Sequence, residues 1–179
     1  MSLKNISKSK PNDTKNGAKD DKIIIDTITV YTDGSYMKTK QGEKCGYGVY
    51  FPNKELSNIS KKFKKFPLTN QRAELYAIYK AIKKISKKIK FNRLEIYSDS
   101  EYSIKSLTIW IKSWKKNNWK TANKKEVLNQ DIIKKIDKLL SKYDGKIFFT
   151  HVRSHTGKKD KHSLGNEEAD KLATAGAAK

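Results

Sequence analysis

Four acidic residues lie in short polar segments of the sequence and could together bind metal ions. They are Asp33 in YTDGS, Glu74 in TNQRAEL, Asp99 in YSDS and Asp170 in GNEEAD. Each could also be an ordinary solvated acid in a turn, at a helix end or on a helix surface. If the fold brings them together, their carboxylates repel one another, and divalent cations relieve that repulsion. Mg²⁺ prefers carboxylates combined with water and phosphate oxygens, so the set predicts a metal site for a phosphate-containing substrate.

The strong positive charge of the chain points to a polyanionic partner. Its 179 residues include 40 Lys and Arg against 19 Asp and Glu, a net charge of +21. Such an imbalance favours nucleic acid or an anionic membrane surface. No apolar run approaches the roughly 20 residues that span a bilayer, and no basic amphipathic helix is long enough to suggest surface binding. Nucleic acid is therefore the predicted partner, and no membrane association is expected.

Cys45 is the only cysteine, so a disulfide within the chain is excluded. This fits a reducing intracellular compartment, without distinguishing nucleus from cytoplasm. One Cys and three His also cannot build a Cys-rich zinc site. A hard cation on oxygen ligands is therefore the expected metal.

Composition divides the chain into a polar tail and one domain. Residues 1–22 hold six Lys and three Asp with few large apolar side chains, so a disordered tail without a secretory signal is expected there. Six minus three is +3, which is a small share of the +21. Residues 23–179 are then a single domain that carries most of the positive charge.

Changes of periodicity predict the elements that position the acids. Residues 23–36, 46–51 and 56–66 read as three antiparallel strands, and the apolar residues of 75–89 follow helical spacing. The later predicted elements are a strand at 94–98, a helix opened by the capping-box pair Ser98 and Glu101, a Trp- and Lys-rich segment at 110–125, a helix at 127–140, a strand at 147–152, a loop at 155–165 and a helix at 166–177.

These elements predict an α/β fold that can assemble the four acids. A strand–helix–strand crossover implies parallel pairing, so we expect a mixed five-stranded sheet flanked by helices, with three antiparallel strands followed by parallel ones. Asp33 and Asp99 come from strands, or strand ends, that can be neighbours. Glu74 precedes the core-facing Leu75 and lies near the edge of the buried helix face.

Taken in order, the four acidic segments resemble the ribonuclease H1 family. WKKNNWKT at 114–121 and KEVLN at 125–129 resemble the basic protrusion of its cellular, eukaryotic-like type. The resemblance covers roughly residues 26–177, and its five motifs in order are more specific than any single motif. It implies the ribonuclease H-like fold, with the catalytic domain at 23–179 and the protrusion around 110–125. Residues 1–22 are too short and polar for the separate hybrid-binding module of some relatives.

The resemblance also implies the reaction. Relatives of this type are endonucleases that hydrolyse the RNA strand of RNA–DNA hybrids by two-metal-ion in-line displacement, leaving 3′-hydroxyl and 5′-phosphate ends. Carried over, the ligands of two Mg²⁺ ions, or of Mn²⁺ as a substitute, are Asp33, Glu74, Asp99 and Asp170. No small-molecule cofactor is expected, and the chain is expected to act as a monomer.

A histidine on the predicted loop has a counterpart in the family. His155 in SHTG matches the loop histidine that assists proton transfer or product release, a task that suits imidazole near neutral pH. The loop is longer than is usual in the family, so His162 remains a rival. His151 falls on the strand pattern and is interpreted as structural.

Both strands of the hybrid have predicted contacts. Asn70 and Gln71 resemble the pair that reads RNA 2′-hydroxyls, with helix capping as the alternative role. The predicted DNA-strand residues are Thr69, Tyr102, Trp110 and Asn129. Trp114 and Trp119 are expected to be mostly structural. Pro67 stands where the family's phosphate pocket usually has Arg, which weakens the expected pocket unless a nearby Lys compensates.

Three other classes of protein share parts of this pattern. Integrases, transposases and exonucleases share the fold class, but the Asn70–Gln71 pair and the Trp/Lys protrusion favour a ribonuclease H. A non-catalytic hybrid or double-stranded RNA binder would gain nothing from clustered carboxylates facing phosphates, and it would bind in the presence of a chelator. A basic membrane-surface protein lacks the helix it would need.

Overall fold

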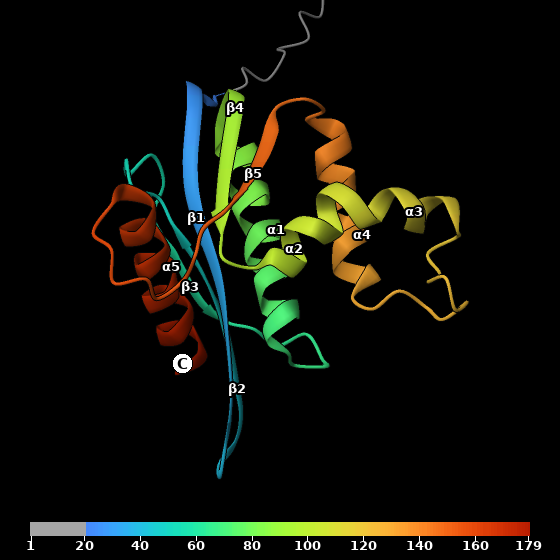
Figure 1. The fold of residues 1–179 in the computed structure, drawn as a ribbon. Helices are drawn as coiled ribbons and strands as arrows, with labels where there is room; N and C mark the ends of the chain where they lie inside the picture. The colour runs from blue at the N-terminus through green and yellow to red at the C-terminus, as the bar shows by residue number, and fades with distance from the viewer. Residues whose placement is uncertain (1–20) are drawn as a thin grey trace, which may run out of the picture.

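The computed structural model describes residues 21–179, so the expectation for the tail concerns residues that lie almost wholly outside the described part. Five strands form one sheet in the order β3-β2-β1-β4-β5 (Figure 1). The strands are β1 (Ile23–Thr39), β2 (Gly42–Tyr50), β3 (Ile59–Lys62), β4 (Ile89–Ser98) and β5 (Ile147–His151). Pairing is antiparallel from β1 to β3 and parallel from β1 through β4 to β5, which confirms the predicted mixed sheet.

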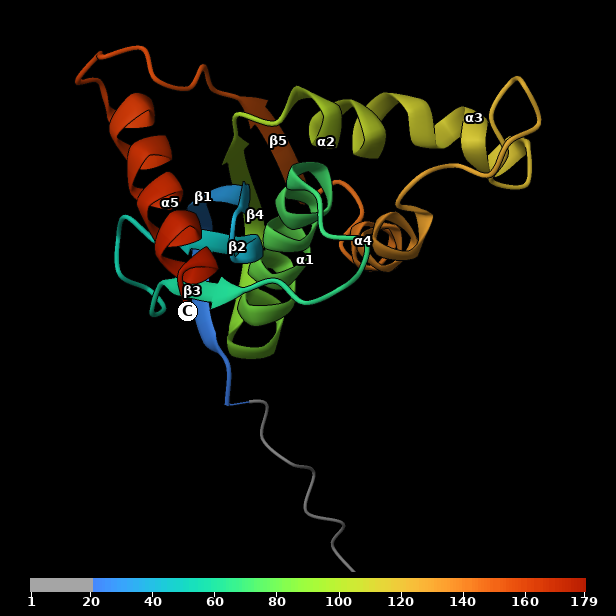
Figure 2. The same cartoon turned by 90° about the horizontal axis from the view of Figure 1, so that it is seen from below.

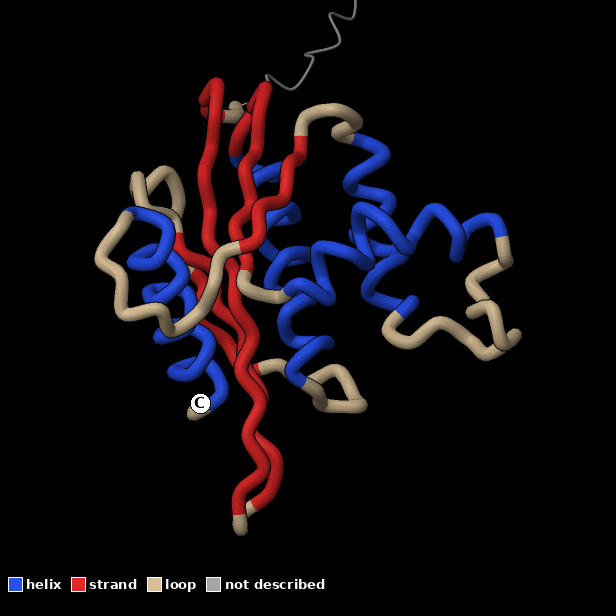
Figure 3. Tube along the Cα trace, viewed as in Figure 1, coloured by secondary structure: helices blue, strands red, loops and turns tan. Residues whose placement is uncertain are grey.

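Helices cover both faces of this sheet. They are α1 (Asn70–Lys88), α2 (Glu101–Lys105), the π-helical turn η1 (Ser106–Trp110), α3 (Ile111–Lys116), α4 (Gln130–Lys142) and α5 (Lys161–Ala177). Figure 2 shows α5 on one face and α1 with α4 on the other, while α3 projects away from the body. The alternation of red strands and blue helices along the tube is visible in Figure 3. Among the described residues, no helix is both long and apolar enough to cross a bilayer.

The two main helices attach to the sheet by different means. On α1 the predicted apolar stripe is buried at Leu75, Ile78 and Ile82, whereas Tyr79 of the same stripe is only partly buried. Burying each such side chain contributes about 1.5–3 kcal/mol. The buried residues of α5 are Gly165, Asn166, Ala169, Ala173, Gly176 and Ala177. A β-carbon at Gly48 of β2 would lie 2.6 Å from the Ala173 nitrogen, so a glycine is required for this close approach.

Several predicted boundaries are wrong. β3 covers only Ile59–Lys62 instead of 56–66, and β4 begins at Ile89 instead of 94. The helix expected at 127–140 is α4, which begins at Gln130 after Asn129 in the left-handed region (φ 63°). These boundaries depend on contacts between elements, which periodicity within one segment does not report.

The starts of two helices differ because other side chains cap them. α5 begins at Lys161 instead of 166, since the Asp160 carboxylate accepts hydrogen bonds from the His162 and Ser163 N–H groups. The loop predicted at 155–165 is correspondingly shorter. α2 is capped by Ser100, whose hydroxyl accepts from the Ser103 N–H, and not by Ser98.

Candidate active site

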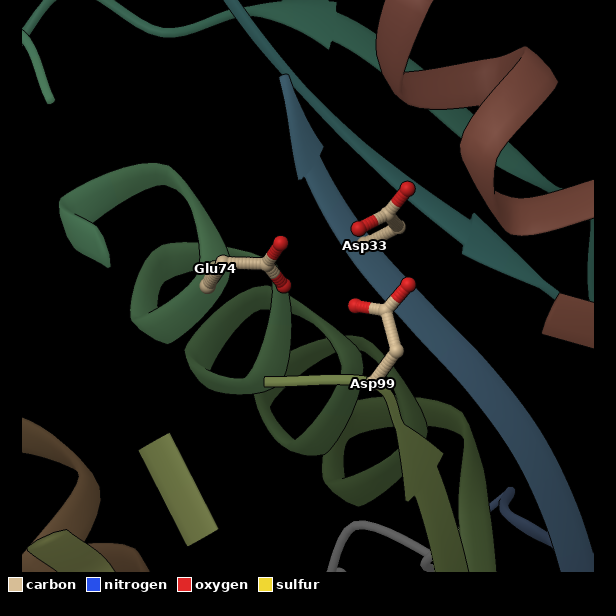
Figure 4. A group of neighbouring side chains, drawn as sticks. All are labelled: Asp33, Glu74 and Asp99. Carbon is tan, nitrogen blue, oxygen red and sulfur yellow. The ribbon is translucent and has the colours of Figure 1, made fainter. Parts of the chain in front are cut away.

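Three of the four predicted acids meet where β1, β4 and α1 converge. Parallel pairing of β1 with β4 aligns Thr32 with Ser98, which places the following residues, Asp33 and Asp99, side by side. Glu74 reaches them from the second turn of α1 (Figure 4). One carboxylate oxygen from each acid lies within 4.8 Å of the others. The strands and the helix therefore bring three separate segments into one acidic cluster, as predicted.

A glycine allows α1 to come this close to β1. A β-carbon at Gly34 would lie 2.7 Å from the Ala73 carbonyl carbon, far closer than ordinary packing permits. The Gly34 N–H also donates to Asp33 Oδ1 at 2.9 Å. Gly34 in the YTDGS segment thus has two roles, one in spacing and one in orienting the neighbouring carboxylate.

Burial makes this cluster electrostatically costly. Asp33 is 4% exposed and Glu74 is 3% exposed. Burial is the largest effect in raising the pKa of Asp33 to about 8, with smaller contributions from Asp99 and Asp170, while hydrogen bonds with Glu74 and Gly34 oppose it. The pKa of Glu74 is raised well above its usual range, first by burial and then by the charge of Asp33.

Glu74 also provides a test of whether a cation fits. Its Oε2 atom is buried and has no hydrogen-bond partner among residues 21–179. An unpaired buried acceptor costs about 1–3 kcal/mol, and a divalent cation would satisfy it. An all-oxygen donor set suits Mg²⁺ or Mn²⁺, so the residues present fit a hard metal ion.

Asp170 lies at the wall of the same pocket. It comes from α5 and lines the pocket together with the three clustered acids. Within the described chain it is not one of the three whose oxygens lie within 4.8 Å of one another. Its negative charge nevertheless contributes to raising the pKa of Asp33. The structure therefore brings four acids to one pocket, three of them in a tight group.

Sequence reasoning missed Asn166, which supports this group. Asn166 is 4% exposed, and its Nδ2 donates to Asp99 Oδ2 at 3.1 Å. Its Oδ1 is buried without a hydrogen-bond partner among the described residues. The available signal was its spacing of four residues from Asp170, which places both on one face of a helix.

The three histidines have different surroundings. His155, in the left-handed region with φ 50°, lines the pocket with the acids. His162 is stacked on Tyr97 with ring centroids 4.3 Å apart, and its Nδ1 lies 3.0 Å from the Tyr31 hydroxyl. His151 is exposed on β5, with Nε2 3.2 Å from the Asp99 carbonyl oxygen. Only His155 of the three shares the pocket lining with the acids.

The sequence model of the family described as RNase H matches residues 26–178 of this chain. The chain belongs to the RNase H family. This confirms the resemblance that the five motifs indicated.

Individual relatives agree with the family match. Ribonuclease H of Schizosaccharomyces pombe is 41% identical over 153 residues, which cover 85% of this chain and 53% of that protein. Ribonuclease H1 of Homo sapiens is 38% identical over 153 residues, which cover 85% and 50%. The chain thus spans about half the length of these relatives. The solved PFV RNase H domain has a TM-score of 0.70 at 29% identity and covers 84% of this chain and 94% of that one.

At the start of α1, the structure distinguishes the residue that caps the helix from the residue that lines the acidic pocket. The side chain of Thr69 caps the helix by accepting from the Arg72 N–H at 3.1 Å, so the alternative of Asn70 as the cap is wrong. Asn70 is exposed and lines the acidic pocket. Gln71 is exposed as well, but it is not among the pocket-lining residues.

The predicted DNA-strand residue Asn129 belongs to a hydrogen-bonded network that sequence reasoning did not find. Its Nδ2 donates to the Tyr102 hydroxyl at 2.9 Å, and its Oδ1 accepts from Arg72 Nη1 at 3.3 Å. Arg72 is buried and also forms a two-point ion pair with Asp131, at 2.8 Å for both bonds. Arg72 is therefore held in place by Asp131 beside Asn129.

A row of aromatic rings leads from Tyr102 of α2 into the RNase H protrusion. Ring centroids are 6.0 Å apart from Tyr102 to Trp110, 6.0 Å from Trp110 to Trp114 and 6.5 Å from Trp114 to Trp119. Trp114 and Trp119 pack against the core, whereas Trp110 is 38% exposed. Trp110 is therefore the tryptophan with most surface free for a ligand.

Proposed function

We propose that this chain is an endonuclease that hydrolyses the RNA strand of RNA–DNA hybrids. The observation that carries the proposal is the tight cluster of Asp33, Glu74 and Asp99, with an unpaired buried oxygen, in a chain of the RNase H family. A net charge of +21 supports a nucleic acid as the substrate. The clustered acids favour an enzyme over a plain binding protein, because negative charge facing phosphates would weaken binding.

Divalent cations are part of this proposal. Two Mg²⁺ ions, with Mn²⁺ as a substitute, would be held by Asp33, Glu74, Asp99 and Asp170. When bound, such ions activate an attacking water and stabilise charge on the leaving 3′-oxygen, which would give 3′-hydroxyl and 5′-phosphate ends. The chain's own groups prepare this site: the Gly34 N–H orients Asp33, and the Asn166 amide orients Asp99.

We also propose the conditions under which the chain acts. It would work as a monomer without a small-molecule cofactor, in a reducing intracellular compartment. Cys45 is fully buried, and burial raises the pKa of its thiol to about 11, so the side chain would stay a protonated thiol.

His155 is the proposed proton carrier. Replacing His155 and His162 in turn shows which of the two histidines has this role. We expect His155→Ala to lower kcat about 100-fold with little change in KM, because general acid–base groups contribute on that scale. The control is His162→Phe, which retains a ring against Tyr97, and about threefold or less is expected for it. Steady-state cleavage of a labelled hybrid measures both. A larger loss in His162→Phe than in His155→Ala would transfer the role to His162.

Each strand of the hybrid has its own set of proposed contacts. Asn70, at the pocket, and Gln71 would read the 2′-hydroxyls of the RNA strand, which both donate and accept hydrogen bonds. The DNA strand would lie along Thr69, Tyr102, Trp110 and Asn129. Exposed lysines of the protrusion would neutralise its phosphates.

Asn129→Ala is expected to weaken hybrid binding more than it slows the reaction. The dissociation constant in EDTA should rise about tenfold, because a hydrogen bond to a charged group is worth about 1.5–3 kcal/mol, while kcat changes about twofold or less. Asn129 has φ 63°, so alanine also strains the backbone. Asn129→Gly removes the side chain without that strain and should show the same weakening. Unchanged affinity in both variants would exclude Asn129 from the DNA-strand contacts.

Cleavage of labelled duplexes tests the function itself. Equal lengths of RNA–DNA, RNA–RNA and DNA–DNA duplex are incubated with the chain in Mg²⁺, in Mn²⁺ and in EDTA, and products are sized with end-group standards. We expect cuts in the RNA strand of the hybrid alone, lost in EDTA. Hybrid binding without cleavage in either metal would indicate a binding protein on an RNase H scaffold.

A further inference from the structure

A basic groove lies between α1 and the edge strand β3, apart from the acidic pocket. It is a groove of about 580 Å³ whose walls come from α1, from β3 with the loop before it, and from the last residue of the chain. No acidic residue lines it. Its six lysines are Lys61, Lys80, Lys83, Lys84, Lys87 and Lys179. We call these residues the lysine groove.

Hydrogen bonds across the lysine groove position two of its lysines. Lys84 Nζ, from α1, donates to the Ser57 hydroxyl at 2.8 Å. Lys179 Nζ donates to the Ser60 carbonyl oxygen at 2.6 Å. None of the six lysines forms an ion pair with a carboxylate of residues 21–179. No carboxylate of the described residues therefore neutralises these side chains by direct contact.

Electrostatics shows that this concentration of charge is unfavourable in the free protein. Burial, followed by repulsion from Lys83, lowers the pKa of Lys80. Burial, followed by repulsion from Lys61, lowers the pKa of Lys84. Bound anions would offset this repulsion by favourable interaction with the ammonium groups.

The lysine groove is not an extension of the proposed active site. Lys80, Lys84 and Lys87 follow Glu74 by 6, 10 and 13 residues in α1. At 1.5 Å and 100° per residue, they lie about 9–20 Å further along the helix and roughly 80–140° around it. The two sites also share no lining residue. A duplex held at the acidic pocket would leave the groove open to another ligand.

The chemistry of the lysine groove fits phosphate better than protein. Protein interfaces have an apolar centre, whereas the apolar lining residues Tyr47 and Ile59 are themselves buried, at 4% and 8% exposure. A duplex is stiff over about 150 base pairs, so it would bridge a concave recess rather than enter it. A flexible single strand can bend into the groove and place successive phosphates against several ammonium groups.

We propose that the lysine groove binds the sugar–phosphate backbone of a single-stranded nucleic acid, as a second site beyond the proposed active site. A strand that extends from a hybrid, or a separate strand, would then be held by the same domain that holds the duplex. The proposal does not depend on catalysis, because binding can be measured in EDTA.

Salt dependence of binding tests the proposal with matched variants. The triple variant Lys80→Gln/Lys84→Gln/Lys87→Gln is compared with Lys138→Gln/Lys142→Gln/Lys146→Gln, which removes the same charge from exposed positions on and after α4. The probe is a labelled 20-nucleotide oligo-dT in EDTA, from 50 to 200 mM salt. Each lost phosphate contact lowers the slope of log affinity against log salt by about 0.7. We expect a loss of slope of about 2 in the groove variant only, so that its loss of affinity at 50 mM salt is roughly 20-fold larger than its loss at 200 mM.

Lysine footprinting of the unaltered chain provides an independent readout. An amine-reactive reagent should modify Lys80, Lys84 and Lys87 more slowly when oligo-dT is bound, while Lys138 and Lys142 react at unchanged rates. Equal slopes in the two triple variants, together with no protection in the groove, would overturn the proposal. Protection by tripolyphosphate but not by oligo-dT would also overturn it, in favour of a small-anion site.

Discussion

Asp99→Asn is expected to abolish cleavage of an RNA–DNA hybrid while hybrid binding in EDTA is retained or strengthened, because one negative charge facing the phosphates is removed. The substitution is nearly isosteric, and the asparagine oxygen can still accept the Asn166 hydrogen bond that holds Asp99. What it removes is one negative charge and one anionic metal ligand from the cluster. Bound metal ions supply several kcal/mol of charge stabilisation, so losing their full complement should slow cleavage about 1,000-fold or more.

Single-turnover cleavage in Mg²⁺ measures this effect, and hybrid binding in EDTA is measured alongside. Asp144→Asn is the matched control, since Asp144 is exposed and its replacement changes the net charge by the same amount. It should cleave at the unaltered rate. If Asp99→Asn retained more than about a tenth of the rate, the acidic cluster could not be the metal site proposed here.

Asp33→Asn is expected to stabilise the metal-free protein against unfolding at neutral and higher pH. Burial raises the folded-state pKa of Asp33 to about 8, whereas an unfolded chain has the ordinary value near 4. Between these values the folded chain binds more protons than the unfolded chain, so the stability of the metal-free protein falls as pH rises from about 4 to about 8. Asparagine cannot ionise, which removes this loss. We expect a gain on the order of 2 kcal/mol at pH 8 and little at pH 4.

Urea unfolding in EDTA at a series of pH values checks the sign and the window. Asp144→Asn is again the control and should follow the unaltered chain. Adding Mg²⁺ should stabilise the unaltered chain more than Asp33→Asn, because only the former retains the full ligand set. A metal-free chain that became more stable from pH 5 to pH 8 in parallel with Asp33→Asn would contradict the raised pKa of Asp33.

The sequence was sufficient for those features that follow from local patterns. Alternation and helical spacing predicted the order of strands and helices, because burial of one face imposes those periods. Asp33 lies in β1, Asp99 directly follows the paired strand β4, and Glu74 borders an apolar helix face. The resemblance of their motifs to the ribonuclease H1 family, together with these positions, led to their prediction as metal ligands.

Features that depend on contacts between distant segments could not be predicted in this way. Arg72 reads as an ordinary helix arginine, and its burial becomes evident only when α4 brings Asp131 and Asn129 against it. His162 remained a rival of His155 in the sequence, and only the structure shows that it is stacked on Tyr97. The early start of α5 depends on the Asp160 cap, which the apolar periodicity of the helix does not report.

The small side chains beneath α5 imply that the domain is not uniformly stable. Glycine and alanine bury little apolar area, so detaching α5 costs less free energy than detaching α1 with its buried leucine and isoleucines. Such an opening would carry Asn166 and Asp170 away while Asp33 and Glu74 remain against the sheet. The acidic pocket would then be incomplete without global unfolding.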